Sequence, residues 1–578
     1  MRNLIAGLGL VCLALGWNAP NHYPPWTTFH LELFAASGVC LLGAATLSVG
    51  WLSRLFGGRG PLVPSPALIS LPLPQAAIGW LVAGLWPVVQ YLSGGLSFRG
   101  DALIGLLYGL GTSLSVYIGL LWSAQVGRTQ VMRQLWLAFV AGGLIAGGLA
   151  LVQWLRLGTP GWWAMELIDS RPYAGFAQPN HFGLLMVMAT VAVTALFESG
   201  TVQHRWVHGL AVAFFGWGVL ISQSRASVLA LIAIAACWLL TRHRVPTRLR
   251  VTDLVVALIA GYVLSQTIGP LEKQLLLQTS EARNYTEIGP RSLIWLHFLA
   301  AIAERPWLGY GFNQGVMALA EVADRVAPSR NVVFAHNVLL DLMAWVGIPL
   351  ALLVTLALGR WMLGWLERTG DTTHAAQRHL VFAIWLALLI QSLLEFPYAH
   401  SYFLLPAALL AGAATTVPRP RLAVTSQVTF VASRTAIGLA AGASMLLGLL
   451  AWEYFQMEDD FRFNRFARAN IGTQRNHESL DAPWILDQLA ALNASATVQA
   501  APGMSTAQIE KLRVLARRFH ILSTRLEYAK ALALNGQPAA AEAEMRIVRS
   551  VYSPAQYESI ARQWQAWLAA QGVSTSDQ

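Results

Sequence analysis

The sequence predicts an all-α polytopic membrane protein with about 12 to 13 transmembrane helices. Of its 578 residues, 55% are hydrophobic and 12% are charged, whereas an ordinary soluble domain carries roughly 25% charged residues. Apolar runs of about 17 to 25 residues recur along the chain, and a run of that length crosses the hydrocarbon core as a helix. Because such a helix satisfies its own backbone hydrogen bonds, lipid can surround most of the fold.

The apolar runs divide the chain into four predicted parts. Residues 1–268 form an N-terminal transmembrane bundle, 269–335 a large loop, 336–454 further transmembrane helices, and 455–578 a helical domain. The first run also resembles the apolar segment of a signal peptide, whose removal would leave the later topology unchanged. The individual spans are expected at 3–17, 29–52, 67–92, 101–122, 132–153, 180–197, 207–222, 226–241, 251–268, 336–358, 379–395, 399–416 and 435–454.

The distribution of arginine predicts the orientation of the chain. If the N-terminus is cytoplasmic, the cytoplasmic segments hold sixteen arginines, and the opposite short loops hold Arg99, Arg156, Arg171 and Arg225. This is the excess expected of cytoplasmic loops. The net charge of +10 is therefore explained by topology. No nucleic-acid partner is predicted, because the arginines form no single stripe with interleaved aromatic residues.

Two segments outside the spans have helical patterns. In the large loop, residues 291–304 are apolar at helical spacing and Pro306 ends the pattern, which predicts an interfacial helix. In the tail, one helix is expected to end at Asn535-Gly536 and another to begin at Pro538. A tetratricopeptide-type hairpin and a plain helical domain without a recognition role are both consistent with that pattern.

A polar, turn-rich segment at 171–183 leads into a span on the predicted outer side. Pro179 suits the first turn of a helix, and Gln178 and Asn180 are placed to cap that helix or to bind sugar hydroxyls. Aromatic rings and amides together suit a carbohydrate, because sugar C–H faces stack on rings while hydroxyls need amide partners. Capping and glycan binding both remain open.

Two outer arginines are candidates for binding phosphate. Arg225 lies in a polar interruption at 222–227, and its guanidinium can form paired bonds to phosphate oxygens, with a lipid headgroup contact as the alternative. Arg291 begins the 291–304 helix, where a cation opposes the helix dipole while the free amides attract an anion. An ion pair with Glu287 or Glu304 is the alternative for Arg291.

The large loop enters the following span at His336-Asn337. Histidine takes and returns a proton near neutral pH, so His336 is a candidate general base, with a capping or interfacial role as the alternative. Asn337 and Asp341 are four residues apart and share a helix face. Asp341 is expected to orient a neighbouring polar group or to hydrogen-bond another helix.

A short outer turn at 395–403 is expected to close over the same site. Glu395 is a supporting residue of this turn, and Tyr402 is a candidate hydroxyl contact for the substrate. An aromatic belt at the membrane interface explains the tyrosines of this turn equally well.

Several kinds of site are not predicted. The sequence contains no Walker loop, no dinucleotide fingerprint and no HExxH motif. Cys12, Cys40 and Cys237 lie inside apolar runs without disulfide or metal spacing. The acidic run at 458–460 follows the last span and is expected to be a solvated exit segment. We therefore expect no cofactor and no metal.

The order of these segments resembles the O-antigen ligase and O-antigen polymerase superfamily, and within it the bacterial protein O-oligosaccharyltransferases (PglL-type pilin glycosylation ligases). The resemblance covers roughly residues 1–455. Residues 174–183 resemble the pilin-ligase signature. The superfamily's ligase core is similar to residues 222–227, 291–311 and 336–347.

The resemblance implies a GT-C-like ligase fold in the bacterial inner membrane, with the active site facing the periplasm. The implied reaction moves a preassembled oligosaccharide from undecaprenyl pyrophosphate to a Ser or Thr hydroxyl of a pilin or another exported protein. Arg225 and Arg291 would bind the pyrophosphate and stabilise its growing charge. His336 would position or deprotonate the acceptor hydroxyl. The implied contacts to glycan or acceptor are Gln178, Asn180, Asn337 and Tyr402.

Three other functions compete with this interpretation. An O-antigen ligase shares the chemistry but uses a lipid A core sugar as acceptor, and an O-antigen polymerase is the next alternative. A transporter or flippase would show inverted repeats and charge pairs in the middle of the membrane, which the sequence lacks. The segment at 174–183 and the helical tail favour protein glycosylation.

Overall fold

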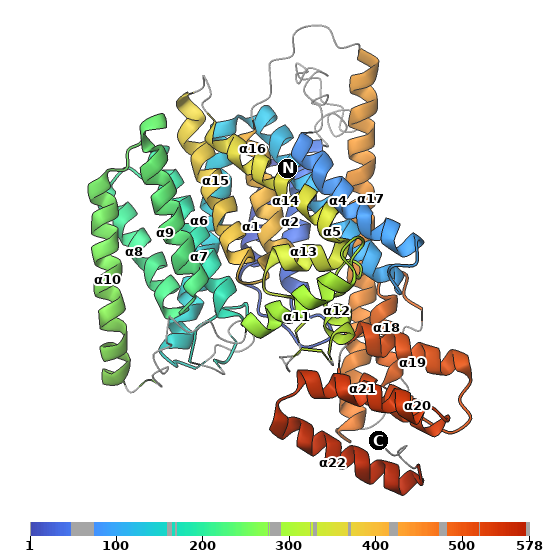
Figure 1. Ribbon diagram of the computed structural model, residues 1–578. Helices are drawn as coiled ribbons and strands as arrows, with labels where there is room; N and C mark the ends of the chain where they lie inside the picture. Colours follow the sequence, from blue (N-terminus) through green and yellow to red (C-terminus); the bar gives the residue numbers. More distant parts are fainter. Residues whose placement is uncertain are drawn as a thin grey trace. The chain divides into compact units, whose positions relative to one another are not determined.

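The protein is helical throughout the part that the computed structural model describes (Figure 1). Within that part, nine helices are long and apolar enough to cross a membrane, and three shorter apolar helices accompany them. The predicted all-α polytopic class is confirmed, and the chain is a multi-pass membrane protein. The described residues are 2–47, 74–158, 165–167, 170–275, 277, 291–323, 325–326, 332–367, 372–415, 426–472, 482–496, 498–519 and 521–573.

The chain folds into two compact units. Unit 1 comprises Met1–Gly84, Leu107–Tyr285 and Leu358–Gly448, and unit 2 comprises Leu85–Leu106, Thr286–Ala357 and Leu449–Gln578. Four helices contribute residues to both units, namely α4 (Gln75–Leu92), α5 (Arg99–Val126), α14 (Ile348–Leu363) and α17 (Ser426–Arg468).

Unit 1 is built around α7 (Pro179–Glu198). This helix is apolar on every side and almost wholly buried, as expected of a helix in the middle of a bundle. Small residues allow close packing, since a Cβ added to Gly143 would lie 2.5 Å from Ala189 Cβ on α7. The helices that pack on α7 are α6 (Arg128–Trp154), α8 (Arg205–Ile221), α9 (Arg225–Thr241) and α15 (Thr372–Ser392). The other helices lying wholly in unit 1 are α1 (Arg2–Leu15), α2 (Phe29–Leu47), α10 (Val251–Gln274) and α16 (Ser401–Ala414).

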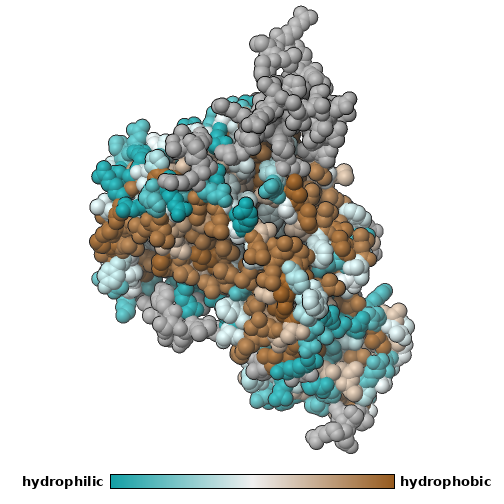
Figure 2. All heavy atoms as spheres, turned by 45° about the horizontal axis from the view of Figure 1, so that its top comes forward, coloured by the Kyte–Doolittle hydropathy of each residue, from teal (hydrophilic) through white to brown (hydrophobic). Residues whose placement is uncertain are grey.

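The edge of unit 1 faces lipid. Helix α10 lies beside α8 at this edge, and none of its residues is buried although most are apolar (Figure 1). Figure 2 shows a band of apolar side chains across this side of the unit, with hydrophilic side chains at both ends of the helices. An apolar face without a protein neighbour is typical of a helix that borders hydrocarbon.

Unit 2 contains a break within the span predicted at 336–358. The chain forms two helices there, α13 (Val338–Val346) and α14, so the prediction of one continuous span is wrong. Gly347 between them has φ +81°, and a Cβ at this position would lie 2.1 Å from the carbonyl oxygen of Trp307. The close approach of a second backbone therefore requires glycine and interrupts the helix.

The turn at 309–311 fastens α11 (Arg291–Glu304) to the end of α13. The Tyr310 N–H donates to the Ala344 carbonyl at 2.7 Å, and the Tyr310 hydroxyl donates to the Ala301 carbonyl at 2.9 Å. Burial raises the pKa of that hydroxyl to about 12, so it stays a donor in alkaline solution where an ordinary tyrosine ionises. The predicted helix at 291–304 is confirmed, and the short α12 (Gly315–Glu321) packs beside it.

The last long helix continues past the predicted end of its span. Helix α17 runs to Arg468 without interruption. Asp460 is buried, so the expected solvated exit segment at 458–460 is wrong for that residue. A helix ends at Leu534 and the next begins at Pro538, which confirms the predicted helix boundaries, while the tetratricopeptide-type assignment stays a prediction. The C-terminal helices are α18 (Asp487–Ser495), α19 (Thr506–Arg518), α20 (Leu522–Leu534), α21 (Pro538–Val551) and α22 (Pro554–Gln571).

Side chains of the C-terminal helices hold the start of α5 within unit 2. The Asp487 carboxylate accepts the N–H groups of Arg99 at 3.1 Å and Gly100 at 2.8 Å, which would otherwise have no partner in the first turn. Arg518 forms two hydrogen bonds of 2.7 Å to Asp101. Burial raises the pKa of the Asp487 carboxyl. The C-terminal helices are therefore a packed part of unit 2.

We predict that Gly412→Ala destabilises the protein. A Cβ at Gly412 of α16 would lie 1.9 Å from the Val116 carbonyl oxygen of α5, so the two helices would have to move apart. Overpacking of this kind costs about 1–3 kcal/mol. Gly438→Ala on α17 is the matched control, because nothing lies within 4 Å of a Cβ there. The midpoint of thermal unfolding in detergent should fall only for Gly412→Ala, and equal midpoints would contradict the prediction.

Candidate functional site

Helix α7 begins as the sequence predicts. Gln178 is its N-cap, with its side-chain oxygen accepting the Asn180 N–H at 3.3 Å, and Pro179 is its first residue. The preceding turn contains Ala174 at φ 51° and Ala177 at φ 53°, in the left-handed region that non-glycine residues rarely adopt. The capping role of Gln178 is thus confirmed, and contact with a glycan remains a prediction.

Asn180 links the loop before α7 to the end of α15. Its side-chain oxygen accepts Arg171 Nη2 at 3.2 Å, and its side-chain nitrogen donates to Glu395 Oε1 at 2.7 Å. Its backbone carbonyl accepts Gln391 Nε2 at 2.8 Å. Both ends of the amide are therefore used inside the protein. This arrangement supports a positioning role for Asn180, and its predicted contact with substrate is not tested.

Arg171 in turn holds the turn that precedes α9. Its Nε and Nη2 atoms donate to the Ser222 carbonyl at 3.0 and 2.8 Å. The chain then passes through Gln223 at φ 48° to Ser224, which caps α9. Arg225 is the first residue of that helix. The structure therefore brings the polar interruption that carries Arg225 next to the segment at 171–183.

Gly183 allows α7 to approach the polar interruption at 222–227 closely. A Cβ at Gly183 of α7 would lie 2.6 Å from Ser227 Oγ and 2.8 Å from Ser222 Oγ. Unit 1 therefore joins three segments that the sequence analysis singled out separately, namely 171–183, 222–227 and 395–403.

Tyr402 lies inside unit 1. It is fully buried, its hydroxyl lies 3.2 Å from His181 Nδ1, and its carbonyl accepts Trp17 Nε1 at 2.7 Å. Phe176 packs on it with ring centroids 5.7 Å apart. These contacts make Tyr402 part of the buried core of unit 1 at the start of α16. Its predicted hydroxyl contact with substrate remains a prediction.

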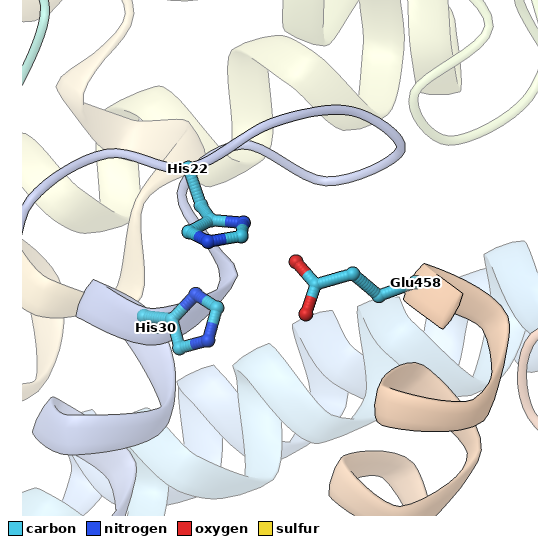
Figure 3. Close-up of side chains that lie close together, drawn as sticks. All are labelled: His22, His30 and Glu458. Carbon is cyan, nitrogen blue, oxygen red and sulfur yellow. The ribbon is translucent and has the colours of Figure 1, made fainter. Parts of the chain in front are cut away.

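The sequence analysis did not single out the polar residues at and before the start of α2. Glu32 is a buried carboxylate within the span predicted at 29–52, and a charged residue in an apolar run is itself a signal of a functional or positioning role. His22, on the loop before α2, and His30 lie with ring centroids 4.8 Å apart (Figure 3). Figure 3 also draws Glu458, which belongs to α17 in unit 2. The start of α2 is therefore much more polar than its hydropathy suggests.

In unit 2, His336 occupies a constrained position directly before α13. Its φ is 54°, and the next residue, Asn337, caps the helix by accepting the Leu339 N–H at 3.0 Å. Left-handed geometry costs a non-glycine residue of order 1–3 kcal/mol, and it persists only where the surroundings impose it. Because Asn337 supplies the cap, His336 is not needed as a capping residue.

Two side chains impose this geometry by holding the Ala335 peptide groups. Both carboxylate oxygens of Asp341 accept the Ala335 N–H, at 3.0 and 3.1 Å. The Trp295 indole donates to the Ala335 carbonyl at 3.0 Å. Asp341 is fully buried, and through this contact it holds the segment that leads into its own helix. Its two predicted roles remain predictions. The backbone that enters His336 is therefore fixed from both α13 and α11.

Arg291 is the first residue of α11, one helical turn before Trp295. The alternative ion pair with Glu304 is wrong, because these residues lie at opposite ends of the helix, about 20 Å apart at 1.5 Å per residue. Glu304 instead pairs with Arg325. The other alternative partner, Glu287, lies outside the described residues. Both predicted phosphate-binding arginines thus begin a helix, where free backbone amides attract anions.

Comparison with known proteins identifies the family. A family described as O-antigen ligase matches residues 210–355, which include Arg225, Arg291 and His336. Over 469 residues the chain is 30% identical to the general O-oligosaccharyltransferase of Acinetobacter baylyi (strain ATCC 33305 / BD413 / ADP1), covering 78% of this chain and 76% of that protein. The chain belongs to the bacterial protein O-oligosaccharyltransferases. The predicted family is confirmed.

Two further similarities extend beyond the ligase region. The ComP-specific O-oligosaccharyltransferase of the same Acinetobacter baylyi strain is 24% identical over 252 residues, which are 43% of this chain and 44% of that protein. A family described as virulence factor membrane-bound polymerase, C-terminal, matches residues 379–566. This second family match covers the outer turn at 395–403 and most of the C-terminal helices, which the O-antigen ligase match does not reach.

We predict that Asp341→Ala destabilises unit 2. The substitution leaves the buried Ala335 N–H without either acceptor that Asp341 now supplies, and an unsatisfied buried donor costs about 1–3 kcal/mol. Asp341→Asn is the matched control, since it keeps one acceptor oxygen and nearly the same shape. The thermal midpoint in detergent should fall more for alanine than for asparagine. An alanine variant as stable as the wild type would show that the Asp341 contact is unimportant.

Proposed function

We propose that this chain transfers a preassembled oligosaccharide en bloc from undecaprenyl pyrophosphate to Ser or Thr hydroxyls of exported proteins such as pilin. The observation that carries the proposal is the kinship with the general O-oligosaccharyltransferase, which extends over most of both proteins. The constrained histidine before α13 supports it, because a fixed base is what glycosyl transfer to a hydroxyl requires.

The proposed reaction takes place at the periplasmic side of the bacterial inner membrane. The arginine excess in alternate loops supports a cytoplasmic N-terminus, which puts the start of α9 and the loop before α13 on the periplasmic side. A lipid-linked donor and an exported acceptor meet at that surface. No cofactor or metal is part of the proposal, since the pyrophosphate leaving group already carries most of its working charge.

Arg225 and Arg291 are proposed to bind the donor pyrophosphate. Each is the first residue of a helix of at least three turns, so its guanidinium and the free amides of that helix offer several donors to phosphate oxygens. As the bond from the anomeric carbon to the phosphate oxygen breaks, negative charge grows on the pyrophosphate. Arginines held in advance at that position stabilise the charge without rearrangement.

His336 is proposed to act on the acceptor. The hydroxyl oxygen forms a bond to the anomeric carbon, the bond to the pyrophosphate breaks, and the hydroxyl proton passes to the imidazole. Inversion at that carbon is the simplest outcome. Gln178, Asn337 and Tyr402 remain proposed contacts to glycan or acceptor, directly or by supporting the turns around them.

A second candidate is an O-antigen ligase, which transfers the same kind of donor to a lipid A core sugar. The match of residues 210–355 to the O-antigen ligase family favours this candidate, because those residues carry the proposed catalytic groups. The acceptor distinguishes the two candidates, whereas donor and chemistry do not.

We predict that His336→Ala abolishes protein glycosylation. Loss of a general base lowers the rate by about 10²- to 10⁴-fold. The measurement is intact-mass spectrometry of an acceptor protein coexpressed with the enzyme and a lipid-linked glycan, with lipopolysaccharide examined on gels in parallel. Lipopolysaccharide should stay normal. Loss of O-antigen with intact glycoproteins would instead identify the ligase.

We also predict that Arg225→Ala and Arg291→Ala each lower transfer by about 10²- to 10³-fold, because each removes a preorganised donor to the leaving group. Arg360→Ala is the matched control, since Arg360 is an exposed arginine in the last turn of α14 on the predicted cytoplasmic side. The Arg360→Ala variant should transfer glycan at the wild-type rate. Unchanged transfer by either Arg225→Ala or Arg291→Ala would contradict its proposed role in phosphate binding.

A further inference from the structure

Glu32, in the first turn of α2, is the buried carboxylate around which the outer turn of unit 1 is arranged. It accepts hydrogen bonds from Thr28 Oγ1 at 2.9 Å and from the Tyr108 hydroxyl of α5. It also accepts the Ser401 N–H at 3.2 Å and the Ser401 hydroxyl at 2.9 Å. His400 Nδ1 lies 3.4 Å away. A charged carboxylate only accepts hydrogen bonds, and each of these groups is able to donate.

The contacts of Glu32 and of its hydrogen-bond partner Tyr108 reach three successive residues of the outer turn, Ala399, His400 and Ser401. His400 and Ser401 contact the carboxylate directly, and the Tyr108 hydroxyl oxygen lies 3.1 Å from the Ala399 carbonyl oxygen. The His400 ring stacks on Tyr402 with centroids 4.9 Å apart. Residues 399–402 are therefore held by α2 and α5, which lie far from them in the sequence.

The other end of this turn reaches the start of α9 through side chains. Glu395 accepts the Asn180 amide, Asn180 accepts Arg171, and Arg171 donates twice to the Ser222 carbonyl. The 3-10 helix η4 (Pro397–Ala399) joins Glu395 to the residues that Glu32 holds. A continuous set of hydrogen bonds and one short turn thus connects α2 to the residues directly before Arg225.

We propose that Glu32 is a positioning residue for donor binding. It holds the outer turn at 395–402, and through Glu395, Asn180 and Arg171 that turn sets the start of α9, which carries Arg225. The inference rests on the proposed function, because Arg225 is assigned to the pyrophosphate there. Glu32 itself touches no substrate in this scheme. Its charge matters because the carboxylate offers two acceptor oxygens to its hydrogen-bond donors, whereas the amide of glutamine would offer only one.

The test measures initial rates of glycan transfer by the full-length enzyme while the lipid-linked donor and the acceptor protein are varied separately. Glu32→Gln should lower kcat/KM for the donor about ten- to hundredfold, the loss expected from a small misplacement of a binding group. The KM for the acceptor should change less than twofold. Glu32→Asp keeps the carboxylate and should recover part of the loss.

Glu453→Gln is the matched control. Glu453 is also buried and accepts the N–H groups of Trp484 at 2.6 Å, Ile485 at 2.8 Å and Leu486 at 3.0 Å. It lies in unit 2, outside the set of contacts that begins at Glu32. This variant should lower the thermal midpoint while leaving kcat/KM for the donor within twofold of the wild type.

Several results would overturn the inference. Wild-type donor kinetics in Glu32→Gln would do so, as would an effect confined to the acceptor or an equal donor defect in Glu453→Gln. If Glu32→Gln does not fold, Tyr108→Phe removes one donor to the carboxylate, and a wild-type kcat/KM for the donor in that variant would count against the proposal. Absence of transfer to protein by the wild type would instead refute the proposed function.

Discussion

The structure depends on one constraint, which is that irregular backbone next to apolar helices needs hydrogen-bond partners. An unsatisfied buried N–H or C=O costs about 1–3 kcal/mol, and the hydrocarbon core of a bilayer holds no water that could replace the missing partner. Acidic side chains meet this need repeatedly. Asp341 accepts the N–H before His336, Glu32 holds the start of α16, Asp487 caps α5, and Glu453 accepts three N–H groups after α17. Glu32, Asp487 and Glu453 each hold backbone outside their own helix, and Asp341 holds the segment directly before its own helix. These carboxylates therefore fix how neighbouring elements meet.

This constraint explains why the proposed catalytic groups occur at helix starts. A helix start combines free amides, which attract phosphate, with a short irregular segment that can present a side chain in an unusual direction. His336 and Gln223 both have left-handed backbones in such segments, and neighbouring side chains hold each segment in place. Strain of this kind is stable only because the surrounding contacts are complete. The same side chains therefore satisfy the backbone hydrogen bonds and hold the proposed catalytic groups in place.

Sequence patterns predicted the structure correctly where residues a few positions apart determine it. The cap at Gln178, the helix at 291–304 and the hairpin at 535–538 follow from residue types a few positions apart, and the structure has all three. Local patterns failed where a distant contact decides the outcome. The run at 336–358 is uniformly apolar, yet the Trp307 carbonyl lies against Gly347 and the helix breaks there. Asp460 is charged in sequence but buried by packing, and Glu32 went unnoticed because one carboxylate hardly changes the hydropathy of its run.

By itself, the sequence determined that this protein is a polytopic helical membrane protein, because the thickness of the bilayer sets the length and hydropathy of each span. It also determined the O-oligosaccharyltransferase family, because the family's motifs are short and contiguous in the sequence. Only the tertiary structure decided which polar segments meet. Asn180 contacts Glu395 and Glu32 contacts Ser401 across more than 200 residues of chain. Such contacts depend on how apolar helices pack side by side, and helix periodicity carries no information about which neighbour a given polar side chain will find.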